Sequence, residues 1–226
     1  ERGASFAEVE NFYDENMSLI RIKLNPAISP AANAQKYYKD YQKAKNAEHI
    51  LTEQIEKGRS ELEYIDSVLD TVSRAESERE LAQIREELTE QGYLRKQKGK
   101  QRPQAALPPL EFTSSDGFKI LVGRNNTQND KLTLKIANKN DMWLHTKDIH
   151  GSHTVVFAEG REISDTAILE AAQLAAYYSK ARESSQVPVD YTLVRYVSKP
   201  SGARPGMVIY VNNKTVYVTP KANISE

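Results

Sequence analysis

A seam of mostly apolar positions between residues 37 and 72 constrains the fold more than any other feature of the sequence. Its members follow one another at alternating steps of four and three: Tyr37, Tyr41, Ala44, Glu48, Leu51, Ile55, Gly58, Leu62, Ile65, Leu69 and Val72. This spacing is a heptad repeat. Because Ser29 and Pro30 suit the N-cap and the first helical position, we predict one helix over about residues 31–73. At 1.5 Å per residue it would extend roughly 65 Å and project from any small domain.

A second, shorter helix is predicted to return along the far end of this seam. Ser77 and Glu80 have the S-x-x-E spacing of a capping box. Apolar residues follow at helical steps, namely Leu81, Ile84 and Leu88. We therefore expect a return helix over about residues 78–91, ending near Gly92. It would cover only the distal third of the seam, so the proximal part needs another partner, which is residues 1–29, an upstream segment or a second chain.

The start of the chain is predicted to be mixed. Residues 5–15 suit a short helix. Residues 19–24 alternate apolar and polar side chains, which indicates an extended segment. Residues 1–93 together are expected to form a coiled-coil region.

The two halves of the chain carry opposite charge although the formal net charge is zero. Residues 1–91 contain 12 Lys/Arg and 19 Asp/Glu, a balance of −7, and residues 92–226 contain 19 and 12, a balance of +7. A basic half of this size suits a polyanionic partner, or an ordinary solvated surface. Residues 94–110 form a basic, proline-containing linker, which is either a solvated connection or an arm that contacts phosphates.

Several function classes are excluded by what the sequence lacks. It contains no cysteine, which removes disulfides, Cys-ligated zinc and thiol catalysis. No stretch is long and apolar enough to span a bilayer, and no signal peptide is visible. We therefore expect a cytoplasmic protein, and the start at Glu1 suggests a fragment of a longer chain.

Residues 111–222 are predicted to form a compact mixed α/β domain. Asp116–Gly117 between two apolar runs indicates a β-hairpin. Further strands are expected at residues 142–145, 154–157 and 189–197, and a second hairpin joins residues 207–211 to 215–218. Helices are expected near residues 129–137 and 164–182. The fold class is therefore α+β, a long coiled-coil helical hairpin followed by a compact domain.

The segment Asp141–His153 holds three of the four histidines and the single tryptophan. Strand alternation places Asp141, Trp143 and His145 on one face. The histidine spacing matches no zinc template, and Ser152 beside His153 has no triad order, so we predict no metal site and no catalytic residue.

Recognition of RNA is the remaining interpretation of this segment. A tryptophan face with His145, His153, Lys147 and Arg124 around it resembles the way in which single-stranded RNA is held. The alternative is that Trp143 belongs to the core and His145 is a buried, satisfied histidine.

Two polar loops extend this candidate surface. Arg124–Asp130 follows a strand and opens a helix, whose N-terminus favours anions, although a simple capped loop explains it equally. Lys199–Gly206 is a stiff loop that presents Lys199 and Arg204, or a plain turn.

Three linked motifs resemble the RNA-binding domain of the NFACT family: GRNNTQND (Gly123–Asp130), DMWLHTKDIHGSH (Asp141–His153) and KPSGARPGMVIY (Lys199–Tyr210). Asn33–Lys45 and Ala82–Leu94 resemble the coiled-coil region of that family. His150 stands where the family usually has proline, so it is assigned no role. The resemblance implies that Arg124, Asn125, Asp141, Trp143, His145, Ser152 and His153 contact RNA.

The resemblance also implies a role in ribosome-associated quality control. Such proteins bind a large ribosomal subunit that holds peptidyl-tRNA, and recruit tRNA for C-terminal alanine tailing. The family's N-terminal domains are not recognised in this chain, so we expect it to be no enzyme by itself and to need no cofactor. Streptococcal members have been assigned fibronectin binding at the cell surface, which makes an adhesin the alternative function.

Overall fold

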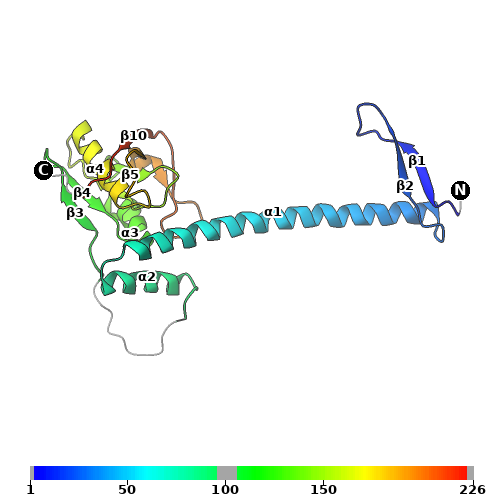
Figure 1. Cartoon of the computed structure of the whole chain (residues 1–226), viewed down its shortest axis with the longest axis horizontal. Coiled ribbons are helices and arrows are strands. Elements are labelled where there is room, and N and C mark those ends of the chain that lie inside the picture. The colour runs from blue at the N-terminus through cyan, green and yellow to red at the C-terminus, as the bar shows by residue number, and fades with distance from the viewer. Residues whose placement is uncertain (1–2, 96–105, 223–226) are drawn as a thin grey trace. The chain divides into compact units, whose positions relative to one another are not determined.

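A computed structural model of the chain describes residues 3–95 and 106–222 (Figure 1). Most of the predicted basic linker lies outside the described residues. The chain forms two compact units, residues 1–60 and residues 61–226, which are taken separately below. Helix α1 (Pro30–Arg74) contributes to both units and matches the predicted helix at residues 31–73.

Unit 1 begins with a small β-ribbon. Strands β1 (Phe6–Glu10) and β2 (Leu19–Lys23) pair antiparallel, with Glu8 opposite Arg21. The helix predicted at residues 5–15 is therefore wrong: alternation over residues 6–10 matches that of β2, and the ladder is reinforced by the Arg21 guanidinium, 3.4 Å from the Phe6 ring centroid. The extended segment predicted at residues 19–24 is confirmed.

The start of α1 is held by one buried amide. Asn33 Oδ1 accepts a hydrogen bond from Asn25 N at 2.8 Å, and Asn33 Nδ2 donates to Asn25 O at 3.0 Å. Beyond it, the apolar seam of unit 1 is largely open among the described residues, apart from the Tyr37 hydroxyl, which donates to Lys23 O at 2.5 Å. Its large members are 46–58% exposed, namely Tyr37, Tyr41, Leu51 and Ile55.

In unit 2 the last turns of α1, from Glu61 onward, pack against α2 (Glu78–Glu90), and we call this pair the helical hairpin. The capping box of Ser77 and Glu80 is present as predicted. The predicted packing face is shifted, however. Tyr64, Val68 and Ile84 form the buried contact.

The shift turns part of the predicted seam outward, because Leu62 and Leu69 are 61% and 64% exposed. Tyr64 sets this register, since its hydroxyl donates to Glu87 Oε1 at 3.0 Å and its ring lies 5.8 Å from that of Tyr93. The buried Tyr64–Glu87 hydrogen bond thus favours packing through the α1 face that carries Tyr64, which the spacing of apolar residues alone did not predict.

A six-stranded antiparallel sheet forms the centre of unit 2, in the order β10-β7-β5-β6-β4-β3. The strands are β3 (Leu110–Thr113), β4 (Lys119–Val122), β5 (Met142–Thr146), β6 (Thr154–Val156), β7 (Val187–Leu193) and β10 (Lys214–Val218). The predicted Asp-Gly hairpin is confirmed, with Gly117 at φ +82° in its turn. The α+β class is confirmed as well.

Both faces of the sheet are covered. Helix α4 (Asp165–Tyr177) packs an alanine-rich side against one face and encloses Ile120, Leu144 and Val156. The opposite face is covered by short elements, namely α3 (Asn126–Lys131), a π-helix (Leu132–Ile136), a 3-10 turn (Val194–Tyr196), β8 (Val197–Ser198) and β9 (Ile209–Tyr210). We call these elements the second layer.

The hairpin predicted between residues 207–211 and 215–218 does not form. Strand β9 pairs with β8, and β10 pairs with β7, with Val216 opposite Val189. Val216 and Val218 pack with the core under α4, which draws β10 into the large sheet instead. Across the described residues, no helix combines the length and apolar character that a bilayer span requires.

Candidate functional site

Trp143 lies inside the protein, between the sheet and the second layer. Its side chain is 0% exposed and packs against Leu132, Val155 and Val197. The Tyr210 ring centroid lies 4.8 Å from its own. The predicted indole open to nucleotides is therefore wrong, and the core alternative is right, because the π-helix and β9 cover this face of the sheet.

Asp141 is likewise a structural residue. Its buried carboxylate accepts a hydrogen bond from Ala158 N at 2.9 Å and from Asn138 N at 2.7 Å. Its backbone oxygen also accepts from Val194 N at 2.9 Å. These bonds fix the start of β5 to the second layer and leave the carboxylate turned away from solvent, so it is no RNA contact here.

Two histidines complete a closed aromatic cluster with Trp143. His145 stacks on the indole at 5.8 Å with an interplanar angle of 13°, and His153 meets the same indole edge-on at 5.2 Å. The His153 ring is 2% exposed, and its Nδ1 lies 2.8 Å from Thr133 Oγ1. Burial, which disfavours the imidazolium, lowers the pKa of His153 well below its usual value and that of His145 to about 4.

We expect this cluster to make stability depend on pH. Since the pKa of His145 falls from 6.5 in an unfolded chain to about 4 in the folded one, its contribution is complete above pH 6.5 and is lost on acidification. The free energy of unfolding should fall by about 1–2 kcal/mol between pH 6.5 and pH 5 on account of His145. Partial solvent access of the ring keeps this loss from being larger. Urea unfolding at pH 7, 6 and 5 measures it.

The His145→Gln variant is the control for this effect. It should show a flatter dependence between pH 6.5 and 5 than the unsubstituted protein. An equal slope in both proteins would exclude His145 as the source.

The predicted cationic and polar loop residues are occupied by the helical hairpin. Arg124 forms an ion pair with Glu80, and Asn125 Nδ2 donates to Gln83 Oε1 at 3.4 Å. Burial raises the pKa of Glu80, but the Glu76 backbone N–H and the Arg124 guanidinium outweigh it and hold that pKa below its usual value. Arg124 Nη1 and Asn125 Nδ2 are thus engaged by α2 inside the unit.

The loop at residues 199–206 is held in the same way. Lys199 pairs with Asp130, and its Nζ also donates to the Arg204 backbone oxygen at 2.9 Å. Arg204 Nη1 donates to Gln91 Oε1 at 3.1 Å. The predicted cations of this loop therefore tie it to α3 and α2.

Glu87 stands where the sequence predicted an anion at the start of a helix. Its Oε2 accepts from Thr127 N at 3.0 Å and from Thr127 Oγ1 at 3.1 Å, and Oε1 accepts from Tyr64. Ser152, also predicted to contact RNA, is buried and accepts from Arg74 Nη1 at 3.3 Å. Hence the polar loop at residues 124–130 serves as the docking surface of the helical hairpin.

Lys147 is the only predicted site residue with an exposed side chain in the described part of the chain, and it lies directly after β5. The sequence interpretation did not single out the other exposed cations of the domain, which include Lys131, Lys135, Lys139, Lys180 and Arg195. Only local charge could have indicated them, since nothing in a lone lysine separates a contact from a solvated residue. Within residues 3–95 and 106–222, no three acidic or histidine side chains are placed to hold a metal ion.

Both halves of the chain are similar to known protein domains. Residues 1–106 match a model described as the NFACT N-terminal and middle domains, and residues 109–212 match the NFACT protein RNA binding domain. The chain is 49% identical over 225 residues to the Rqc2 homolog RqcH of Bacillus subtilis (strain 168), an overlap of 98% of this chain and 39% of that protein.

Two further relatives come from Streptococcus suis. The Rqc2 homolog RqcH of strain 05ZYH33 is 43% identical over 217 residues, which covers 96% of this chain and 38% of that protein. The solved C-terminal part of its fibronectin/fibrinogen-binding protein superposes with a TM-score of 0.79 at 44% identity, over 85% of this chain and 77% of that one. The chain thus spans about two fifths of the length of the curated relatives.

Proposed function

The chain belongs to the NFACT family, and from this premise we propose that it binds the large ribosomal subunit and tRNA as part of a quality-control factor. The observation that carries the proposal is the match of residues 109–212 to the family's RNA-binding domain. The surplus of seven cations in residues 92–226 supports it, since phosphate contacts supply most of the affinity for RNA.

In this proposal the contacts to RNA come from exposed cations rather than from the buried aromatic cluster. Lys147, at the end of β5, is the predicted site residue best placed for such a contact. Trp143 and His153 support the surface from below by fixing β5 against the second layer.

The finer role follows the family resemblance. We propose that the chain helps to recruit tRNA to a stalled subunit for C-terminal alanine tailing, without catalysing a reaction itself and without a cofactor. A ribosomal partner would place it in the cytoplasm. The open seam of α1 in unit 1 would be covered by an upstream segment of a longer polypeptide or by a second chain.

Salt-dependent binding tests the proposal. Fluorescence anisotropy with labelled tRNA should show binding at 50 mM salt that weakens roughly 10–100-fold by 200 mM. Lys147→Glu should weaken binding several-fold at low salt, whereas the buried-site variant Trp143→Phe should retain it. Absence of tRNA binding at 50 mM salt would refute the proposal.

A second candidate function is favoured by the structural relative. The S. suis protein is named for binding fibronectin and fibrinogen, and it shares 44% identity with this chain. We propose fibronectin binding at the cell surface as the alternative role. Surface plasmon resonance on immobilised fibronectin at physiological salt decides it, and no response at micromolar protein would eliminate it.

A further inference from the structure

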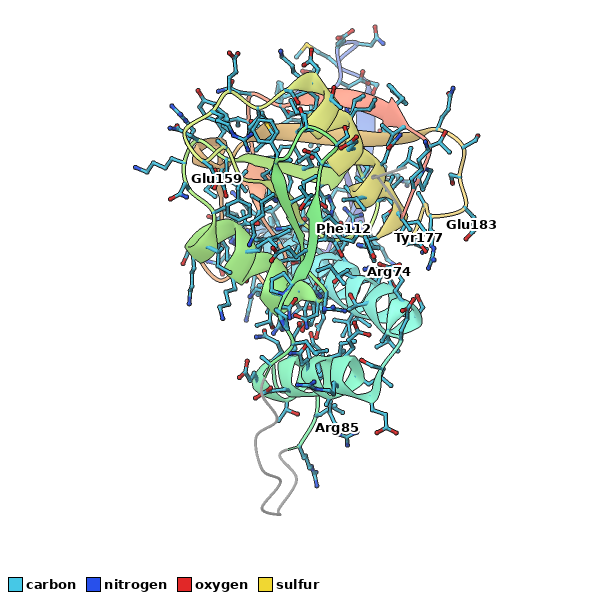
Figure 2. The ribbon with its side chains drawn as sticks, turned by 90° about the vertical axis from the view of Figure 1, so that its left-hand side faces the viewer. Arg74, Arg85, Phe112, Glu159, Tyr177 and Glu183 are labelled. Atoms are coloured by element: carbon cyan, nitrogen blue, oxygen red, sulfur yellow. The ribbon has the colours of Figure 1, made fainter. Side chains whose placement is uncertain are left out.

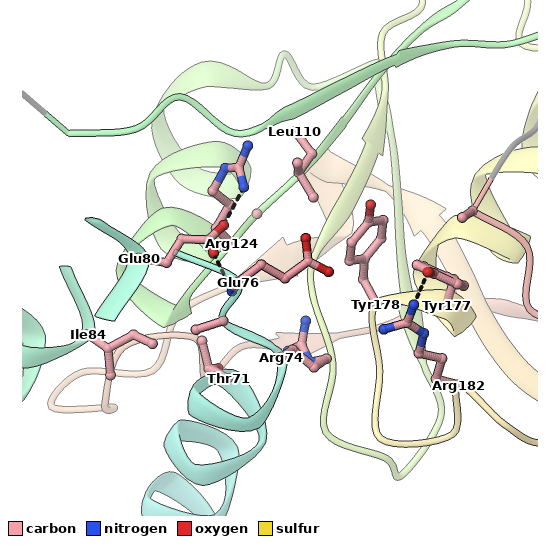
Figure 3. A pocket seen from close by; sticks show the side chains of 13 residues that line it. Thr71, Arg74, Glu76, Glu80, Ile84, Leu110, Arg124, Tyr177, Tyr178 and Arg182 are labelled. Carbon is pink, nitrogen blue, oxygen red and sulfur yellow. Dashed lines mark hydrogen bonds and ion pairs between the residues drawn. The ribbon is translucent and has the colours of Figure 1, made fainter. Parts of the chain in front are cut away.

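A pocket of about 230 Å³ lies in unit 2 where the turn between α1 and α2 meets the β3 edge of the sheet and the end of α4. Figure 3 shows its polar side chains directed toward one space, with Arg124 and Glu80 on one side and Tyr178 on the other. The polar lining consists of Thr71, Arg74, Glu76, Glu80, Arg124, Tyr178 and Arg182 with Tyr177 beside it. Among the residues that line this pocket, Arg124 is the one that the sequence analysis predicted to contact RNA.

The pocket presents guanidinium groups that are held in place from behind. Arg74, the last residue of α1, is fixed by Asp70, with Nη2–Oδ2 at 2.8 Å, and lies next to the sheet domain (Figure 2). Arg124 is fixed by Glu80 and by Pro108 O, 2.9 Å from its Nε. Arg182 stacks on the Tyr177 ring, 3.9 Å from its centroid, and has no carboxylate partner in the described part of the chain.

Two further groups in the pocket have hydrogen-bonding capacity left over. The half-buried Tyr178 hydroxyl and the exposed Glu76 carboxylate have no side-chain hydrogen bond to any described residue. Burial, and next the negative charge of Glu76, raise the pKa of Tyr178, so its hydroxyl stays protonated as a donor and acceptor. Leu110 and Ile84 add an apolar wall.

We propose that this pocket binds one ribonucleotide unit of the RNA, an inference that rests on the proposed function. The phosphate meets Arg182 and the Arg124 N–H groups that donate to no described residue, because planar guanidinium groups suit phosphate oxygens. The ribose 2′-hydroxyl donates to Glu76, which a purely anionic ligand cannot do. The base lies against Leu110 and Tyr178, as unstacked bases lie on aromatic side chains. The pocket is large enough for one nucleoside and too small for a duplex.

A matched pair of charge reversals tests the phosphate contact. Arg182→Glu changes a residue of the pocket. Lys214→Glu changes an exposed residue of β10, which forms the edge of the sheet opposite to β3. Measured by anisotropy with labelled tRNA at 100 mM salt, Arg182→Glu should lower affinity about tenfold, and Lys214→Glu less than threefold. Equal losses in folded proteins, checked by circular dichroism, would overturn the pocket assignment.

The nearly isosteric Glu76→Gln variant tests the ribose contact with a single-stranded RNA and a DNA of the same sequence. Loss of the carboxylate should weaken RNA binding several-fold while DNA binding stays constant or tightens, since a negative charge has been removed. If both nucleic acids bind equally more tightly, Glu76 merely repels phosphate and the ribonucleotide inference is wrong. Failure of the unsubstituted chain to bind tRNA would instead refute the proposed function.

Discussion

Replacing Trp143 with alanine is expected to destabilise unit 2 by about 3–5 kcal/mol, the loss typical of a buried aromatic side chain. The indole fills the space between Val155 of the sheet and Leu132 of the second layer, and it also contacts the rings of His145 and His153. Without it the second layer loses its main apolar contact. Urea unfolding followed by far-UV circular dichroism measures the change, because the variant lacks a tryptophan signal.

Trp143→Phe separates packing from recognition. It should cost less than alanine, in part because Trp143 Nε1 is buried and has no hydrogen-bond partner among the described residues, so its removal breaks no hydrogen bond seen there. Its affinity for tRNA should match that of the unsubstituted protein. A stable Trp143→Phe protein with much weaker tRNA binding would restore the view that the indole stacks on a base.

Replacing Glu87 with alanine is expected to cost about 3 kcal/mol and to release the helical hairpin from the sheet domain. The buried carboxylate accepts three hydrogen bonds, one from Tyr64 and two from Thr127, and joins α1, α2 and α3. Its loss leaves the buried Tyr64 hydroxyl without its acceptor and also removes the acceptor of the Thr127 N–H, which is only partly shielded from solvent.

Hydrogen exchange is the appropriate measurement, because the hairpin can open without unfolding the sheet. Amides of α2 should exchange much faster in Glu87→Ala, and those of β5 should not change. Glu86→Ala, next to it on the exposed side of α2, provides the matched control. Figure 2 shows the same outward side, where Arg85 points away from the sheet domain. Equal exchange in both variants would show that Glu87 does not hold the hairpin.

Charge and sequence motifs predicted part of the candidate RNA surface but not which of its residues are covered. The sequence interpretation correctly placed Trp143 and His145 on one face of β5, since alternation follows from strand geometry. It did not reveal that Leu132–Ile136 covers that face, because a five-residue π-helix has no clear periodic signal. It also did not reveal that Arg124 pairs with Glu80, 44 residues earlier in the chain.

The sequence also did not predict the pocket lined by Arg182, Glu76 and Tyr178, because that pocket depends on contacts between distant segments. Arg182 and Glu76 are unremarkable in the sequence, one at the end of a helix and the other in a turn. Only the packing of the helical hairpin against the β3 edge brings them to one pocket with Tyr178.

The sequence by itself determined the features that depend on neighbouring residues. The bounds of α1 and α2, the capping box at Ser77 and the turn at Gly117 all follow from local dihedral preferences and hydrogen bonds. The tertiary structure alone decided which faces of the sheet and helices are buried and which cations, such as Arg124 and Lys199, are already paired within the fold. These depend on contacts between distant segments, where a buried Tyr64–Glu87 bond or a covering layer over Trp143 outweighs any local pattern.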